Sequence, residues 1–314
     1  MNYRKGQNVR FFIDGVVTAE ETTLTITRGV DTENSQNKDL AADSSSGNIA
    51  GEIPVAMWKN MSFQVEAQGE GAKTLFTKAL ALMTDEGGVV GWAQTSGTGN
   101  RTAGSGGVQN VHAICNDLTI TAPNRQPVTC TAQFMVVPGS TTTTGGSAAA
   151  ITTDILRGEF LRLFIGTSTA SKPIALATSA SLHVSLSLEE ATTKDETSSS
   201  GSSGLAYKAQ APTTLTYEIT SDTLYGGNDT AQDIDALEEG ATYKWKLADA
   251  SSTHQWTAGT TLISGEAMLT SLNTNAPVAQ NVTHSGTFTG IGVFDSASAQ
   301  SDSPSLDPAT PLGN

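Results

Sequence analysis

The segment AICNDLTITAP, residues 113–123, recurs in altered form as AMLTSLNTNAP, residues 267–277. Both copies start with Ala and end with Ala-Pro, and the second copy lies 154 residues after the first. The Leu-Thr-Ile-Thr alternation of the first copy is typical of a strand with one buried face. A strand repeated at this distance predicts that the chain contains the same domain twice.

Other matches keep nearly the same separation on either side of this strand. Phe63, in the alternating stretch MSFQVEA (residues 61–67), corresponds to Tyr217 in LTYEITS (residues 215–221). A nearly constant separation shared by several elements indicates a duplicated fold. The remaining matches are Arg10-Phe11-Phe12-Ile13 with Arg162-Leu163-Phe164-Ile165, Lys38-Asp39 with Lys194-Asp195, Trp92 with Trp245, Val128-Thr129 with Val282-Thr283, and Phe134 with Phe288.

Each half also carries one helical pattern. In GAKTLFTKALALMTDEGG (residues 71–88), Leu75, Ala79 and Leu82 are spaced to line one helix face before a glycine stop. The second pattern is DTAQDIDALEEG (residues 229–240). Each half thus reads strand, strand, long loop, strand, helix and three strands. The sequence predicts a mainly β fold of two tandem β-sandwich or curled-sheet domains, each with one flanking α-helix.

The boundary between the two halves is predicted by the run PGSTTTTGGSAAA, residues 138–150. Its residues are small and polar and show no periodicity, as in a flexible linker. We place the first domain at residues 1–138, the linker at 139–153 and the second domain at 154–298. Residues 299–314, rich in proline and serine, are expected to form a loose tail.

Charge and hydropathy exclude several classes of protein. Lys and Arg total 17 against 31 Asp and Glu, which gives a formal net charge of −14 and disfavours a phosphate-binding surface. No apolar run approaches the ~18 residues of a membrane span. The apolar run near the N-terminus is broken by Asp14, so we expect neither a signal peptide nor membrane insertion.

Residue types that often carry chemistry are present, but without the spacing that the chemistry needs. No histidine has a second ligand at metal-binding spacing, and the glycine-rich residues 95–107 lack the strand-turn-helix context of a dinucleotide loop. The acidic cluster in the second helical pattern lacks the ligand order of an EF-hand. We therefore expect no catalytic residue, no metal and no cofactor. The residues considered are His112, His183, His254 and His284, and Asp229, Asp233, Asp235, Glu238 and Glu239.

Cysteines and tryptophans leave alternatives open. Cys115 and Cys130 flank a predicted turn, where they could pair across a hairpin, although two buried thiols are the favoured interpretation. Four tryptophans could stack on sugars, but the duplicated pair favours core or interface positions. These tryptophans are Trp58, Trp92, Trp245 and Trp256.

The second half opens with GEFLRLFIG (residues 158–166) and continues with IALATSASLHVSLSLEEATTKD (residues 174–195), and the first half follows the same plan in FFIDGVV (residues 11–17) and LTITRGVDTENSQNKD (residues 24–39). This pattern resembles the start of the major tail, or tail tube, proteins of tailed bacteriophages. The resemblance extends from about residue 8 to about residue 295, and its motifs include no catalytic signature. One departure is that this chain holds two such domains where the usual member has one.

The resemblance implies a structural virion protein whose strands join those of neighbouring copies into closed rings. These rings would stack into the hollow tail tube through which DNA passes. Six tube domains form a ring in this family, so three two-domain chains would suffice. The expected partners are other copies of the chain, the tape measure protein, and tail-terminator or baseplate proteins. Assembly would take place in the cytoplasm of the host bacterium.

The same resemblance suggests candidate site residues. Three chains of −14 would give −42 per ring, and an acidic bore would let DNA pass without binding. Glu66 and Glu218, taken as equivalent positions in the two repeats, are candidates for the lumen, with an exterior or interface position as the alternative. The long polar loops at residues 31–52 and 189–211 are candidate contacts between rings. They contain Lys38, Asp39, Lys194 and Asp195.

Three other functions remain as alternatives. A secreted or surface tandem β-sandwich could bind carbohydrate or protein through its tryptophans and glycine-rich loops. A distal tail or terminator protein would form a ring without growing into a filament. An enzyme ranks last, because no nucleophile, base and orienting group come together in the sequence.

Overall fold

The computed structural model describes residues 6–35, 53–96, 102–104, 106–141, 156–170, 172–191, 207–225, 231–250 and 257–296. They belong to two compact units. Unit 1 comprises Met1–Thr119, Thr129–Thr153 and Val184–Thr216, and unit 2 comprises Ile120–Val128, Asp154–His183 and Tyr217–Asn314. The predicted tail and most of the predicted linker lie outside the described residues, and the domain boundaries stay a prediction.

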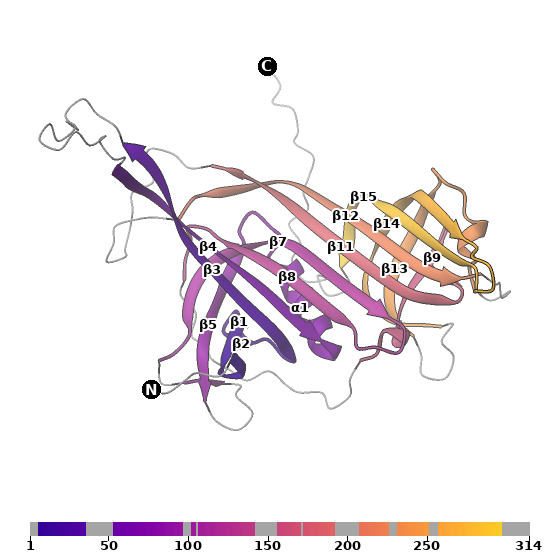
Figure 1. Ribbon diagram of the computed structural model, residues 1–314, viewed down its shortest axis with the longest axis horizontal. Helices are drawn as coiled ribbons and strands as arrows, with labels where there is room; N and C mark the ends of the chain where they lie inside the picture. The colour runs from indigo at the N-terminus through magenta and orange to yellow at the C-terminus, as the bar shows by residue number, and fades with distance from the viewer. Residues whose placement is uncertain are drawn as a thin grey trace, which may run out of the picture. The chain divides into compact units, whose positions relative to one another are not determined.

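Unit 1 is an antiparallel β structure with one helix (Figure 1). Strands β1, β2, β5 and β7 pair in the order β2-β1-β5-β7, and β4 lies between β3 and β8. The elements are η1 (Gly6–Asn8), β1 (Val9–Ile13), β2 (Val16–Val17), β3 (Glu21–Ser35), β4 (Ile53–Gln68), α1 (Gly69–Leu80), β5 (Gly88–Ser96), β6 (Thr102–Ala103), β7 (Gln109–Pro123) and β8 (Thr129–Val136).

Aromatic side chains form the centre of unit 1. The Phe11 ring lies 5.2 Å from the Phe63 ring and 5.1 Å from the Phe134 ring, and all three side chains are fully buried. Helix α1 adds Leu75 and Phe76 to this core. Burial of several large apolar side chains is the main source of the unit's stability.

Unit 2 repeats this plan. It contains η2 (Gly158–Phe160), β9 (Leu161–Gly166), β10 (Lys172–Pro173), η3 (Ile234–Ala236), β13 (Thr242–Ala250), β14 (Ala258–Asn275) and β15 (Thr283–Ser296). Strands β11 (Ala177–Glu190) and β12 (Gln210–Leu224), like β7, contribute residues to both units. The strand order is β10-β9-β13-β14-β15-β12-β11-β7, so the end of β7 completes this sheet. Trp245, Phe164 and Phe288 are buried in unit 2.

The predicted mainly β fold is confirmed, and the order of the main strands repeats between the halves. The predicted helix of the second half is wrong, because its described part forms only the three-residue turn η3. Two backbone hydrogen bonds hold Gln232. Its N–H donates to Pro173 O at 2.9 Å, and its carbonyl oxygen accepts from Ala175 N–H at 2.8 Å. These bonds keep the start of the segment extended, and burial of Ile234 then needs only a single turn.

Backbone details also repeat between the halves. Glu20 and Leu176, which precede β3 and β11, both have positive φ, 48° and 45°. The Glu20 carbonyl accepts a bond from Gln68 N–H at 3.2 Å, and the Leu176 carbonyl accepts one from Leu224 N–H at 3.1 Å. Leu176 follows Glu20 by the same number of residues as Leu224 follows Gln68, so both bonds give the same alignment of the two halves. Two non-glycine residues in this sparsely populated conformation, with matching bonds, indicate one inherited connection.

The same bonds correct one of the predicted residue matches. Because they align Gln68 of β4 with Leu224 of β12, Phe63 corresponds to Ile219 and not to Tyr217. The ladders agree, since Phe63 lies opposite Phe134 and Ile219 lies opposite Phe288.

Trp245 is also shifted relative to Trp92. Trp92 lies opposite Phe11, whereas Trp245 lies opposite Ile165. The predicted match requires Trp245 to lie opposite Leu163. A shift of two residues keeps a side chain on the same face of a strand, which is why the alternating pattern did not reveal it.

Candidate assembly surfaces

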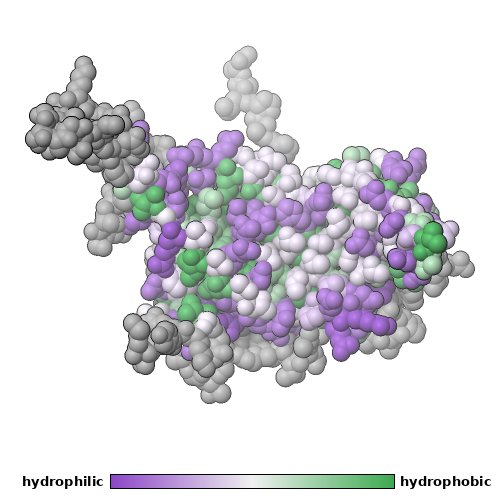
Figure 2. Space-filling view, viewed as in Figure 1, coloured by the Kyte–Doolittle hydropathy of each residue, from purple (hydrophilic) through white to green (hydrophobic). Residues whose placement is uncertain are grey.

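Among the described residues no group of three or more histidine, cysteine, aspartate or glutamate side chains is placed to hold a metal ion. No helix in the same part of the chain is long and apolar enough to cross a membrane. The face drawn in Figure 2 shows hydrophobic residues in small groups among polar ones. The candidate surfaces are the edges of the sheets, their acidic faces, and the base and junction of the β3–β4 and β11–β12 hairpins.

The two predicted lumen candidates both point away from the cores. Glu66 lies between the buried residues Val65 and Ala67, and it is half-buried. Glu218 lies between the buried residues Tyr217 and Ile219, and it is exposed. Because side chains alternate along a strand, both carboxylates are on the outer face of their sheet. Whether that face lines a bore stays a prediction.

These two acids do not occupy corresponding positions. Thr22 donates its Oγ1 hydrogen to the Glu66 carbonyl oxygen at 3.3 Å, and Thr178 donates likewise to the Asp222 carbonyl at 3.1 Å. These pairs follow the alignment of Gln68 with Leu224, so Asp222 is the counterpart of Glu66. Asp222 was missed because only the hydrogen bonds fix the register. Its side chain accepts a bond from Ser179 Oγ at 2.7 Å.

Strand β3 is an exposed sheet edge. Among the described strands it pairs with β4 alone. Leu24 and Ile26 are only half-buried, and Val30 is 47% exposed. Unpaired strand edges of this length tend to recruit further strands.

The counterpart strand β11 has a neighbour on its outer edge. In unit 2, Asn124 N–H donates to Thr178 O at 2.8 Å, and Ser181 Oγ donates to Ile120 O at 3.3 Å. The Thr121 and Ser181 hydroxyls lie 3.1 Å apart. The end of β7, which belongs to the first half of the sequence, therefore covers the edge of β11.

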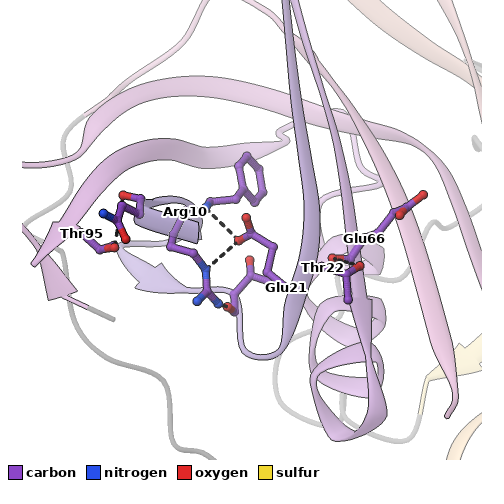
Figure 3. A network of polar contacts seen from close by, with 8 residues as sticks. Arg10, Glu21, Thr22, Glu66 and Thr95 are labelled. Carbon is purple, nitrogen blue, oxygen red and sulfur yellow. Dashed lines mark hydrogen bonds and ion pairs between the residues drawn. The ribbon is translucent and has the colours of Figure 1, made fainter. Parts of the chain in front are cut away.

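A buried acid fixes the base of the β3–β4 hairpin (Figure 3). Glu21 Oε2 accepts a bond from Phe11 N–H at 3.0 Å and forms an ion pair with Arg10 Nε at 3.4 Å. Arg10 also donates to the Thr18 carbonyl. Only 4% of the Glu21 side chain is exposed, and this burial raises its pKa to about 7, while the bonds from Phe11 and Arg10 oppose the rise.

The two long hairpins, β3–β4 and β11–β12, meet within unit 1. Lys208 Nζ lies 2.8 Å from Asp31 Oδ2 and 3.5 Å from Glu190 Oε2, and Asn60 Nδ2 donates to Asp31 Oδ1 at 2.6 Å. The Lys208 hydrogen bond lowers the pKa of Asp31. Lys38, Asp39, Lys194 and Asp195, the predicted inter-ring residues, lie outside the described residues, so their role stays a prediction.

The structure bears on two alternatives left open by the sequence: a disulfide or two free thiols, and sugar-stacking or core positions for the tryptophans. Cys115 and Cys130 are free and buried, which confirms the prediction of two thiols. Trp245 is 2% exposed and its ring lies 5.6 Å from the Tyr217 ring. Trp92 lies 5.5 Å from Phe63. These two tryptophans belong to aromatic clusters, as the core interpretation predicted, whereas Trp256 and His254 lie outside the described residues.

No family model matches this chain, and no curated protein is detectably similar to it. The geometry of its own sheets is therefore the basis for a functional proposal.

Proposed function

We propose that this protein is a structural component that assembles with copies of itself into closed rings, and that the rings stack into a tube. The observation that carries the proposal is the difference between two corresponding strands. The edge of β11 is covered by β7, whereas the edge of β3 has no partner among the described strands. One repeat has its edge strand covered from within the chain, and the corresponding strand of the other repeat does not. This difference favours head-to-tail association, in which a second copy covers the edge of β3.

The type of assembly follows from the resemblance to tail tube proteins. In that interpretation the protein is part of a bacteriophage tail, and three chains supply the six domains of a ring. Other tail proteins would cap the tube or fill it before DNA passes. The formal charge of −14 per chain supports a bore that does not bind DNA, because carboxylates repel phosphates.

Electron microscopy of the purified protein, combined with analytical ultracentrifugation, tests the proposal. We expect hollow tubes or stacked rings, with a repeating mass that is a multiple of three 32.5 kDa chains. A protein that remains monomeric over a wide range of concentration and salt would contradict self-assembly. Single rings that never stack would support the terminator-like alternative, in which the same contact closes a ring without filament growth.

A secreted binding module is the second candidate function, and the exposed edge β3 is compatible with it, because edge strands also capture peptides. The two candidates differ in their partner. A binding module would stay monomeric and would capture a different molecule, whereas the proposed tube protein binds only its own copies along this edge.

A further inference from the structure

We infer which surfaces join one copy of this chain to the next: the outer edge of β3, together with Gly6, binds the end of β14 from a second copy. This inference rests on the proposed self-assembly and specifies its interface. It is derived from a contact that is present within unit 2. Each residue of that contact is replaced by its counterpart in the other half of the chain, which gives the residues of the proposed contact.

The reference contact in unit 2 has two parts. The first is the ladder between the end of β7 and β11, in which Asn124 N–H bonds to Thr178 O at 2.8 Å. The second is a close backbone approach at Gly158, whose N–H donates to Gln126 O at 2.8 Å. A Cβ at Gly158 would collide with the backbone of Ala122 and Pro123.

The first half has the same receiving elements, and no described residue occupies them. Gly6 corresponds to Gly158, because each opens the short turn before the first strand of its half. Among the described residues no atom lies within 4 Å of a Cβ built at Gly6, and the φ of Gly6 is not in the left-handed region. The site that is tightly filled in the second half is therefore not filled by any described residue in the first.

Burial along the two strands shows the same difference. Ala180, Leu182 and Leu186 of β11 are 5%, 1% and 8% exposed. Their counterparts in β3, by the same alignment, are Leu24, Ile26 and Val30, which are half-buried or exposed. Covering these three side chains would remove apolar surface from water, which favours association.

The end of β7, which covers β11, has its counterpart in the end of β14, and no described strand pairs with that end of β14 on the corresponding side. Cys115 N–H bonds to Leu82 O at 3.0 Å, after which β7 continues along β11. Its counterpart, Leu269, donates its N–H to Ala241 O at 3.2 Å. The ladder of β14 with β13 ends at Met268, and no described strand pairs with Ser271–Asn275 on that side.

The turn that follows β14 has the geometry needed to insert. Gln126 N–H bonds to Pro123 O at 3.4 Å in the first half, and Gln280 N–H bonds to Pro277 O at 3.4 Å in the second. Val278, the counterpart of Asn124, is 96% exposed. An apolar side chain so exposed at a shape-matched turn is available for a partner.

The duplication also fixes the register of the new contact. Thr121 and Ser181 face each other in the reference contact, with hydroxyls 3.1 Å apart. Moving each residue to its counterpart places Asn275 opposite Thr25, a pair that can also form a hydrogen bond. Val278 N–H would then donate to the Thr22 carbonyl. Each copy offers one receiving edge and one inserting end, so the contact is head-to-tail and closes when a ring is complete.

Two single-cysteine chains test the register. Thr25→Cys and Asn275→Cys are made in separate chains, mixed in equal amounts and treated with a short bismaleimide. A covalent dimer is expected only in the mixed sample, because each chain carries one half of the pair. The native Cys115 and Cys130 are buried, so unmodified protein serves as a background control. Thr25→Cys mixed with Lys172→Cys, on the exposed edge strand β10, is the mismatched control.

Glycine substitutions test the close approach. Gly6→Leu is expected to raise the concentration for half-assembly at least about tenfold, because its side chain would fill the space that the partner backbone needs. Gly106→Leu is the matched control, since Gly106 also has no atom of the described residues within 4 Å of a built Cβ and no positive φ. The melting temperature of unassembled Gly6→Leu protein should equal that of the unmodified chain.

The outcomes separate the interface from the proposed function. If unmodified protein assembles, but the cysteine pair does not cross-link and Gly6→Leu assembles normally, this interface is wrong while self-assembly stands. If the unmodified protein does not assemble under any condition, self-assembly and this interface both fail. Cross-linking together with selective loss of assembly in Gly6→Leu would establish the contact.

Discussion

Arg125 and Ala279, at corresponding positions in the two halves, adopt the same left-handed backbone conformation, with φ of 60° and 61°. Each follows a proline by two positions in the turn after a long strand. Left-handed conformation strains any residue with a Cβ, and β-branched residues tolerate it least. The same strained conformation therefore occurs in the corresponding turns of both halves.

Replacing Ala279 with valine tests this strain. We expect Ala279→Val to lower the free energy of unfolding by about 1–2 kcal/mol, because a β-branched side chain adds to the cost of a left-handed residue. Val278→Ala, at the neighbouring exposed position, should change it by less than ~0.5 kcal/mol. Urea titration of unassembled protein measures both. Equal stability of Ala279→Val and the unmodified chain would contradict the strained turn.

The two equivalent glycines should respond in opposite ways to the same small substitution. Gly158→Ala is expected to destabilise the fold by about 1–3 kcal/mol, because its Cβ would overlap backbone atoms that cannot move aside easily. The Cβ of Gly6→Ala meets no atom of the described residues and should leave thermal unfolding of the monomer unchanged. Differential scanning calorimetry of both variants provides the comparison, and a similar loss of stability in both would contradict the difference in packing.

Glu21 predicts a specific pH dependence. Burial raises its pKa from 4.5 to about 7 in the folded protein, so the folded state binds a proton more tightly than the unfolded state. Its contribution to stability is present below about pH 4.5 and is lost as the pH rises through 7. Glu21→Gln should therefore gain stability relative to the unmodified chain between pH 5 and 8, by on the order of 1–3 kcal/mol.

Denaturant titrations of the two proteins across this pH range isolate the effect, since all other carboxyls are shared. A constant difference between the proteins would mean that Glu21 titrates normally. A loss of stability in Glu21→Gln at every pH would show that the ion pair with Arg10 outweighs the burial of the carboxylate.

The two cysteines should be chemically inert in the folded protein. Burial raises the pKa of Cys115 and of Cys130 well above the usual range, so the reactive thiolate is scarce at neutral pH. We expect a thiol reagent to modify neither residue in the native state and both after unfolding. Mass spectrometry of labelled protein gives the count, and fast labelling of a folded sample would contradict the buried positions.

The ion pairs of Lys208 predict a local effect without a change in global stability. Lys208→Glu places a carboxylate beside Asp31 and Glu190, so the two long hairpins should repel each other. Hydrogen exchange should become faster near Asn60 and Tyr207, while the unfolding midpoint stays the same, because exposed ion pairs contribute little to stability. Lys208→Gln, which removes the charge without reversing it, should have a smaller effect.

Sequence reasoning recovered much of the organisation of this chain. Alternating apolar residues in stretches such as residues 61–67 predict strands, because period-two burial is a local property of an extended chain. The duplication was also readable, since corresponding strands keep corresponding residues. The burial of Cys115 and Cys130 followed from the apolar character of free thiols. The helix predicted for the second half was wrong, because the bonds that keep Gln232 extended come from β10 and the segment after it.

A mainly β fold made of a duplicated series of elements can be read from the amino-acid sequence, because strand patterns and turn residues are encoded locally. The register between the halves and the partner of each edge depend on contacts between distant segments of the folded chain. A slip of two residues leaves every side chain on the same face, so alternation cannot detect it. Hydrogen bonds between distant segments do fix it. They made Asp222 the counterpart of Glu66, covered β11 with β7, and left the edge of β3 without a partner among the described strands.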